Sequence, residues 1–292
     1  SNTMPIVDYK VPVSVDEAVI MLKGCSTAVK ILAGGTDLII QSKPAGSDPL
    51  TVVDIKSIDS MMTASIDDEG LTLGPAMSCA ELTARDDIKS VYPGLIEAAY
   101  LIGSTQVQGR ASIGGNLSNA SPAADTIPAL IAIGARCIIA GPDGERVVAV
   151  EDFVVGVGKN CMAQGELLKS IQVPPPEAKT SDAYLRFIPR TEMDIAVAGA
   201  GVSITMDSEG VCTAARIVIG AVAVTALLVP AAAAALVGSK LEESALQAAA
   251  AAASAASKPI SDRRGTADYR RHVVGVLVKR AASIAAQRAQ EQ

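Results

Sequence analysis

The most informative stretch of the sequence is Ser112-Ile113-Gly114-Gly115-Asn116, followed by Ser121-Pro122-Ala123-Ala124-Asp125. Two adjacent glycines in an apolar frame let the backbone approach a ligand closely, because no Cβ stands in the way. Their amides can point at an anion, and the side chains of Ser112 and Asn116 add hydrogen bonds. Ser121 is a good N-cap and Pro122 suits the first helical position. This stretch predicts a strand, a glycine turn, a short linker and a helix whose N-terminus faces a ligand.

A second glycine turn lies upstream, in ILAGGTDL at residues 31–38. It follows a predicted helix that begins with a capping-box pattern, Ser14 with Glu17 three residues on, and ends at Gly24. An isolated Gly-Gly pair is more often a tight turn between buried strands than a ligand site. Two such turns in one chain could embrace the two phosphates of a dinucleotide without a lysine.

Three separated stretches carry a family resemblance: ILAGGTDL (31–38), ASIGGNLSNASPAADTIPAL (111–130) and PISDRRGTADYRRHVVGVLVKRA (259–281). Together they resemble the FAD-binding subunit of the molybdenum hydroxylases, the xanthine and carbon monoxide dehydrogenase family. The resemblance implies an α+β fold. It places a two-subdomain FAD-binding domain of the PCMH type at residues 1–175, with subdomains of about 1–58 and 59–175. An α+β C-terminal domain of the CO dehydrogenase flavoprotein type is expected at residues 176–292.

The resemblance also implies the residues that contact FAD. It places the first glycine motif along the pyrophosphate, with Thr36 offering a hydroxyl, while Asp37 could instead cap the turn. Ile102 and Ile195 are expected near the isoalloxazine ring, although Ile102 could simply belong to the apolar face of a helix. The expected set is Ile31, Leu32, Ala33, Gly34, Gly35, Thr36, Asp37, Leu38, Ile102, Ser112, Ile113, Gly114, Gly115, Asn116, Asp125, Leu168, Arg186 and Ile195. No catalytic residue and no metal ligand is expected.

Asp125 has two possible roles. An ionised carboxylate only accepts hydrogen bonds, so Asp125 could hold a ribose or ribityl hydroxyl, or the N–H of the flavin ring. Alternatively, it is an ordinary acid in the first turn of a helix, where it stabilises the helix dipole.

Composition excludes several classes of function. The formal net charge of −6 argues against binding to nucleic acid or to an anionic membrane, because both attract basic proteins. Two Phe and no Trp among 49% apolar residues predict an aliphatic, alanine-rich core. The five cysteines show no C-x-x-C spacing, which argues against an iron–sulfur or zinc site and suits a reducing, cytoplasmic compartment. The first ten residues lack the basic region and apolar run of a signal peptide.

Chemical motifs of other enzyme classes are missing from the sequence. It contains no phosphate-binding G-x-x-x-x-G-K-[ST] loop, no H-E-x-x-H and no G-x-S-x-G. The single histidine, His272, lies beside Arg270 and Arg271, where a surface or capping role is more common than catalysis. Those arginines form either a solvated helix face or a docking surface for an acidic partner. Catalysis would therefore depend on a cofactor.

The remaining patterns organise the chain. Turn residues at 67–70, 141–144 and 207–210 predict three hairpins, and residues 167–173 predict the strand that ends the FAD-binding domain. The triple proline 174–176 and the polar run to Asp182 read as a linker. Residues 217–238 are uncharged and long enough for a membrane span, but glycine and proline divide them. A buried strand followed by a helix starting near Pro230 is the preferred interpretation.

The resemblance implies the middle subunit of a molybdenum hydroxylase with non-covalently bound FAD. Partner subunits would be a large one with molybdopterin and a small one with [2Fe-2S] clusters, arranged as a dimer of heterotrimers. FAD would carry electrons from the clusters to an acceptor such as NAD+ or oxygen. Two alternatives remain open at this point: a self-contained FAD-dependent oxidoreductase of the same fold, and a non-catalytic FAD-binding assembly protein.

Overall fold

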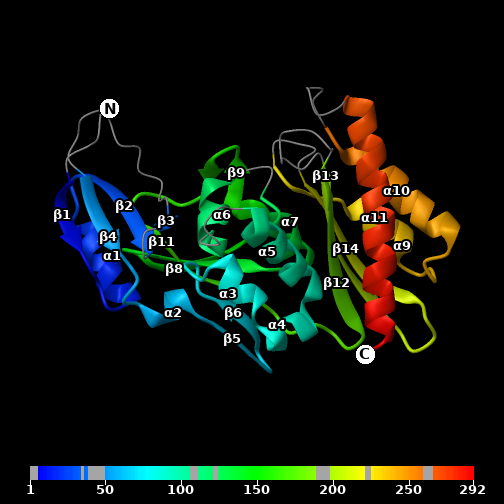
Figure 1. The fold of residues 1–292 in the computed structure, drawn as a ribbon, viewed down its shortest axis with the longest axis horizontal. Coiled ribbons are helices and arrows are strands. Elements are labelled where there is room, and N and C mark those ends of the chain that lie inside the picture. Colours follow the sequence, from blue (N-terminus) through cyan, green and yellow to red (C-terminus); the bar gives the residue numbers. More distant parts are fainter. Residues whose placement is uncertain are drawn as a thin grey trace.

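The computed structural model describes residues 6–33, 36–38, 50–105, 111–120, 124–188, 198–220, 225–258 and 266–292. Three larger sheets follow one another along the longest axis, from the blue N-terminal strands to the red C-terminal helix (Figure 1). The chain is therefore α+β, as the sequence predicts.

The first sheet contains the strands that flank the first glycine motif. Its order is β1-β4-β2-β3, formed by Ile6–Lys10, Leu50–Asp54, Ala28–Ala33 and Thr36–Leu38. Helix α1 (Val15–Lys23) has the predicted caps: the Ser14 hydroxyl accepts a hydrogen bond from the Glu17 amide, and Gly24 ends the helix. Ala18 and Leu22 of α1 pack on Ile31 of β2, which gives this sheet its own small core.

The second sheet is built around two of the predicted hairpins. Its order is β5-β6-β11-β7-β8, formed by Ala64–Asp67, Gly70–Leu73, Leu167–Val173, Arg136–Gly141 and Gly144–Ala149. Its helices are α2 (Asp59–Met62), α3 (Cys79–Thr83), α4 (Asp86–Val91), α5 (Pro93–Thr105), α6 (Ile113–Asn119), α7 (Thr126–Ala132) and α8 (Val150–Phe153). A short pair, β9 (Val154–Gly156) and β10 (Lys159–Asn160), follows α8. Helices α3 to α8 and most of these strands form the most extensive apolar cluster, whereas Met61 of α2 belongs to the cluster of the first sheet.

The third sheet is covered on both faces. Its order is β12-β13-β14-β15, formed by Thr180–Phe187, Ala198–Met206, Cys212–Gly220 and Leu227–Leu228. Helix α11 (Ala267–Gln290) packs on β12 and β13, with α10 (Glu243–Ala256) and α9 (Pro230–Leu236) beside it (Figure 1). Helices α5 and α7 of the middle region also pack against this sheet. The third sheet thus meets α5 and α7, the helices that precede and follow the second glycine motif in the chain.

Close packing of α7 on the third sheet depends on glycine. A Cβ on Gly201 of β13 would lie 2.8 Å from the carbonyl oxygen of Pro128, and a Cβ on Gly220 of β14 would lie 3.2 Å from the Pro128 ring. Since ordinary Cβ contacts are longer, only glycine lets the helix lie this close to the strands. The two regions are therefore fitted to each other at the level of the backbone.

The structure bears on two predictions for the C-terminal half, the linker that ends near Asp182 and the uncharged segment 217–238. The polar run before Asp182 is only partly a linker, because β12 already begins at Thr180 and Asp182 is buried. The uncharged segment 217–238 behaves as predicted, with a strand, β14, followed later by a helix that has Pro230 in its first turn. Within the described residues, no helix is long and apolar enough to span a membrane.

Candidate functional site

The two glycine motifs lie next to each other in the fold. Strands β2 and β3 pair antiparallel, with Ala33 opposite Thr36, and α6 packs against β3. Gly34 and Gly35, which connect the two strands, lie outside the described residues. Segments about eighty residues apart in the sequence thus meet where a shared ligand could contact both.

The second glycine motif is the first turn of a helix, and the predicted glycine turn is wrong. The Ser112 hydroxyl accepts a hydrogen bond from the Gly115 amide at 3.0 Å and so caps α6. The amide of Gly114 donates to the carbonyl oxygen of Pro75 at 2.7 Å, and that of Asn116 to the carbonyl oxygen of Ser112. These amides are therefore used within the protein, which contradicts the expectation that they point at an anion.

Gly114 is required for a different reason from the one predicted. A Cβ at this position would lie 2.7 Å from both Cβ and the carbonyl oxygen of Pro75. Contacts this short cannot be relieved by a side-chain rotation, because one of the atoms belongs to the backbone. Gly114 thus lets α6 begin directly against the segment before α3.

The helix that follows the motif begins later than predicted. Residues 121–123 lie outside the described part, and α7 starts at Thr126, not at Pro122. Asp125 occupies the N-cap position, but its side chain makes no capping hydrogen bond among the described residues. The interpretation of Asp125 as a helix-stabilising acid therefore loses its main support, and its partners lie elsewhere.

Asp125 is held by two side chains of β12. The hydroxyl of Tyr184 donates to Oδ1 of Asp125 at 2.5 Å, and Nη1 of Arg186 donates to Oδ2 at 2.8 Å. The Asp125 side chain is 3% exposed and that of Arg186 is 11% exposed, so this ion pair is largely shielded from water. Burial raises the pKa of Asp125, while the hydrogen bond from Tyr184 and the charge of Arg186 act in the opposite direction.

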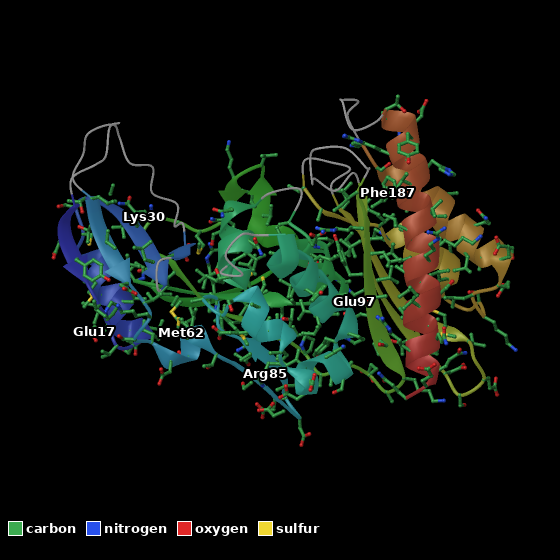
Figure 2. The ribbon with its side chains drawn as sticks, viewed as in Figure 1. Glu17, Lys30, Met62, Arg85, Glu97 and Phe187 are labelled. Carbon is green, nitrogen blue, oxygen red and sulfur yellow. The ribbon has the colours of Figure 1, made fainter. Side chains whose placement is uncertain are left out.

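The Arg186 end of this ion pair opens into a pocket of about 850 Å³. Residues of β12 and of one face of α5 contribute most of the pocket wall: Tyr184, Leu185, Arg186, Ile96, Glu97, Tyr100 and Leu101. Figure 2 shows Glu97 between the helices of the middle region and the third sheet. Within the described part of the chain, Arg186 has further N–H donors and Asp125 has further lone pairs. These groups suit a ligand that carries hydroxyl, imide and phosphate groups.

Other predicted contact residues are buried in apolar clusters. The side chains of Ile102 on α5 and Leu168 on β11 are 6% and 4% exposed and belong to the most extensive cluster. Ile31 is fully buried in the core of the first sheet. Because these side chains are almost completely buried, each could make only a small contact with a ligand. Ile195 lies outside the described residues.

A second polar network links the same elements and was missed from the sequence. The two carboxylate oxygens of Asp182 accept hydrogen bonds from the amides of Gly94 and Leu95, so this residue of β12 caps α5. Arg288 of α11 donates to Glu97 of α5 and to the backbone carbonyl of Asp182. Polar residues at every second position of β12, Asp182, Tyr184 and Arg186, are the signal that could have revealed both networks.

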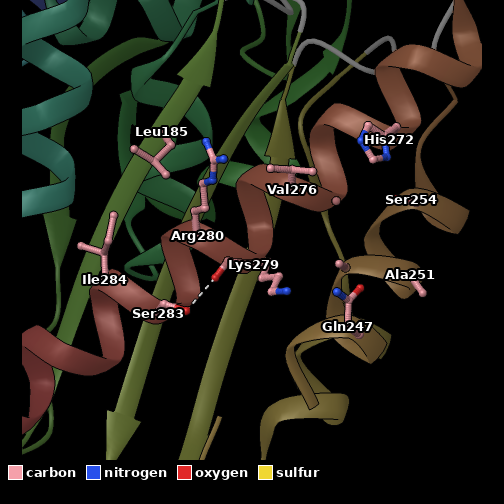
Figure 3. Close-up of a pocket in the computed structure, with 12 residues that line it drawn as sticks. Leu185, Gln247, Ala251, Ser254, His272, Val276, Lys279, Arg280, Ser283 and Ile284 are labelled. Carbon is pink, nitrogen blue, oxygen red and sulfur yellow. Dashed lines mark hydrogen bonds between the residues drawn. The ribbon is translucent and has the colours of Figure 1, made fainter. Parts of the chain in front are cut away.

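A groove of about 840 Å³ lies between α10 and α11, apart from these motifs (Figure 3). His272, Lys279 and Arg280 of α11 line it together with small residues of α10. The expected FAD contacts that belong to the described residues do not line this groove. The described residues also contain no group of three or more His, Cys, Asp or Glu side chains that could hold a metal ion.

Comparisons with known proteins identify the family of this chain. The family described as "FAD binding domain in molybdopterin dehydrogenase" matches residues 5–176, and "CO dehydrogenase flavoprotein C-terminal domain" matches residues 183–285. The carbon monoxide dehydrogenase medium chain of Afipia carboxidovorans is 34% identical over 283 residues, with 97% of each chain covered. Subunit alpha of the 6-hydroxypseudooxynicotine dehydrogenase complex of Paenarthrobacter nicotinovorans is 31% identical, with 98% of this chain and 96% of the relative covered.

A solved structure shows the same fold throughout. Carbon monoxide dehydrogenase from Hydrogenophaga pseudoflava superposes with a TM-score of 0.84 and 33% identity, over 98% of this chain and 99% of that chain. The resemblance therefore extends over both matched regions and over the junction between them. The chain belongs to the family of FAD-binding medium subunits of the molybdenum hydroxylases.

Proposed function

We propose that this chain transfers electrons through its FAD from [2Fe-2S] clusters on a partner subunit to an external acceptor such as NAD+ or oxygen. The observation that carries the proposal is the buried Asp125–Arg186 pair at the edge of a large pocket, close to the second glycine motif. When bound, FAD supplies the redox chemistry. The protein binds and orients the cofactor and sets the electrostatic environment around it.

The described residues suggest how the chain would hold this cofactor. Arg186 has guanidinium donors beyond the one it gives to Asp125, and Asp125 has unused lone pairs on both oxygens. Asn116 lies in the first turn of α6, and strand β3 packs against the same helix. We retain the whole expected set of contact residues, Ile31 to Leu38 and Ile195 included, as the proposed site.

The proposed partners follow from the relatives that are named as medium chains. They are a large subunit with molybdopterin and a small subunit with the [2Fe-2S] clusters, in a dimer of heterotrimers. The proposed location is the cytoplasm. Substrate hydroxylation would occur on the large subunit, so the role of this chain would be electron transfer.

The test is a comparison of the purified complex with the same complex after reversible removal of FAD. Substrate added without oxygen should bleach the cluster absorbance in both preparations. Only the preparation with FAD should then reduce NAD+ or oxygen. Full acceptor reduction by the flavin-free complex would overturn the proposal.

A further inference from the structure

Tyr184 lies outside every motif that the sequence analysis singled out, yet its hydroxyl reaches the proposed cofactor site. The side chain is 3% exposed, and the hydroxyl donates to Oδ1 of Asp125 at 2.5 Å. Arg186, two residues on, holds the other oxygen at 2.8 Å. Alternate residues of one strand therefore hold both ends of one carboxylate.

The strand next to β12 is adapted to this hydroxyl. Gly199 of β13 lies opposite Arg186 in the sheet register. A Cβ on Gly199 would lie 2.5 Å from the hydroxyl oxygen of Tyr184, a distance that real Cβ atoms do not reach. Even alanine at position 199 would therefore displace the hydroxyl. Two positions on neighbouring strands thus converge on placing one oxygen atom beside Asp125.

The shared carboxylate has a defined remaining capacity. An ionised carboxylate offers about four lone-pair sites. Within the described part of the chain, Tyr184 and Arg186 occupy one on each oxygen. With both oxygens fixed, the carboxylate cannot rotate, so the free lone pairs keep one direction. A ligand that donates to them binds without the entropic penalty of ordering this side chain.

We propose that Tyr184 is a positioning residue of the FAD site, which fixes the carboxylate of Asp125 for hydrogen bonds with the cofactor. The inference rests on the proposed function, in which Asp125 contacts FAD. Tyr184 and Arg186, both on β12, are the titratable groups that the described structure brings against Asp125. Loss of the tyrosine hydroxyl would leave burial less opposed, so Asp125 would take up a proton at higher pH.

The experiment measures FAD affinity by fluorescence titration of the apo-protein, at several pH values, for Tyr184→Phe and Gly199→Ala. Removal of a hydrogen bond to a charged group should weaken FAD binding roughly tenfold or more near neutral pH. The loss should grow as the pH falls, because a protonated Asp125 has fewer and weaker acceptor sites than the ionised carboxylate. Both variants should show it, although Gly199→Ala keeps the tyrosine.

Tyr92→Phe is the matched control. Tyr92 is equally buried in the same apolar cluster, and its hydroxyl donates to the carbonyl oxygen of Pro174 at 2.9 Å, away from Asp125. Its loss should lower the melting temperature and leave the pH dependence of FAD affinity unchanged. Melting temperatures of all three variants identify any that fails to fold, and Tyr184→Phe keeps the ring that fills the core.

The outcomes separate the two proposals. Absence of FAD binding by the wild-type chain would overturn the proposed function itself. Wild-type binding with unchanged affinity in both variants would overturn the positioning role alone. An equal, pH-independent loss in Tyr184→Phe and Tyr92→Phe would show a merely structural role and would also overturn it.

Discussion

At the scale of single residues, Asp125 shows how a buried carboxylate is stabilised by hydrogen bonds and an ion pair. Its carboxylate is almost completely shielded from water, so the loss of hydration must be offset by partners. Tyr184 and Arg186 supply those partners from a different sheet. The residue thereby ties the segment after the second glycine motif to the C-terminal region.

Asp125→Asn should weaken FAD binding roughly tenfold or more, because the neutral amide is a poorer acceptor and leaves Arg186 without its counter-charge. The melting temperature should also fall, since a buried cation loses its partner. Glu151→Gln is the control, because it removes the charge of the more exposed Glu151–Arg216 pair at 2.8 Å. Flavin titration of both apo-proteins checks the prediction, and unchanged FAD affinity in Asp125→Asn would remove this residue from the site.

Gly115→Val should abolish FAD binding. Gly115 is buried in the first turn of α6, where a branched side chain would occupy the proposed ligand space and push on neighbouring elements. Cys137→Ala, in the core strand β7, should retain full flavin while costing about 1–2 kcal/mol of stability. Gly156→Ala should be tolerated, because its Cβ would meet only ordinary contacts of 3.6 Å or more. Flavin absorbance per chain tests all three variants.

At the scale of helices and strands, much of the structure could be predicted from local signals. The cap at Ser14 and the turns of three hairpins were predicted correctly, because each depends on a few neighbouring residues. The second glycine motif was not, since a Gly-Gly pair at a helix start is set by its tertiary neighbour Pro75. The residue pairs of the site were also missed, because Asp125 and Tyr184 are 59 positions apart.

The capping of α5 by a strand residue gives a prediction about pH. Burial, reinforced by the charge of Glu97, raises the pKa of Asp182 from 3.8 to about 7, although the Gly94 and Leu95 amides and Arg288 oppose the shift. Because the folded pKa lies above the unfolded one, this group's contribution to stability is full in acid and is lost as the pH rises through about 7. The melting temperature should therefore fall between about pH 4 and about pH 7.

Asp182→Asn should flatten that dependence, since it removes the titrating group. The variant should be less stable than the wild type in acid, because an amide offers one acceptor where two backbone amides need one each. Asp68→Asn, at an exposed turn position, should leave the slope unchanged. Melting curves across this pH range decide the matter, and an identical slope in Asp182→Asn and wild type would contradict the assignment.

At the scale of the whole molecule, the third sheet contributes residues to the candidate site of the preceding region. The helices α5 and α7 pack on it, and its strand β12 supplies Tyr184 and Arg186 (Figure 1). The order of regions could be predicted from the family resemblance. Their mutual contact could not, because it depends on glycines at 201 and 220 that no local pattern explains.

FAD should be held without a covalent bond. Tethering would need a histidine or cysteine near the flavin, but neither glycine motif contains one and the single histidine lies on α11. The cysteines in the core are also poor nucleophiles, since burial raises the pKa of Cys79 to about 12. Acid precipitation should release the yellow colour into the supernatant. Colour that stays with the precipitated protein would contradict this prediction.

The isolated chain should hydroxylate no substrate. Hydroxylation by a molybdenum centre needs the metal, a base beside it and a path for electrons to leave. The described residues bring together no cluster of metal-ligating side chains, and the five cysteines are free and dispersed. With FAD bound, the chain should at best oxidise NADH with an artificial electron acceptor. It should turn over no purine, aldehyde, aromatic heterocycle or carbon monoxide until the partner subunits are added. Anaerobic mixing of each candidate substrate with the pure flavin-loaded chain, followed by flavin absorbance, tests this. Substrate-dependent bleaching with no detectable molybdenum or iron would instead identify a self-contained flavoenzyme.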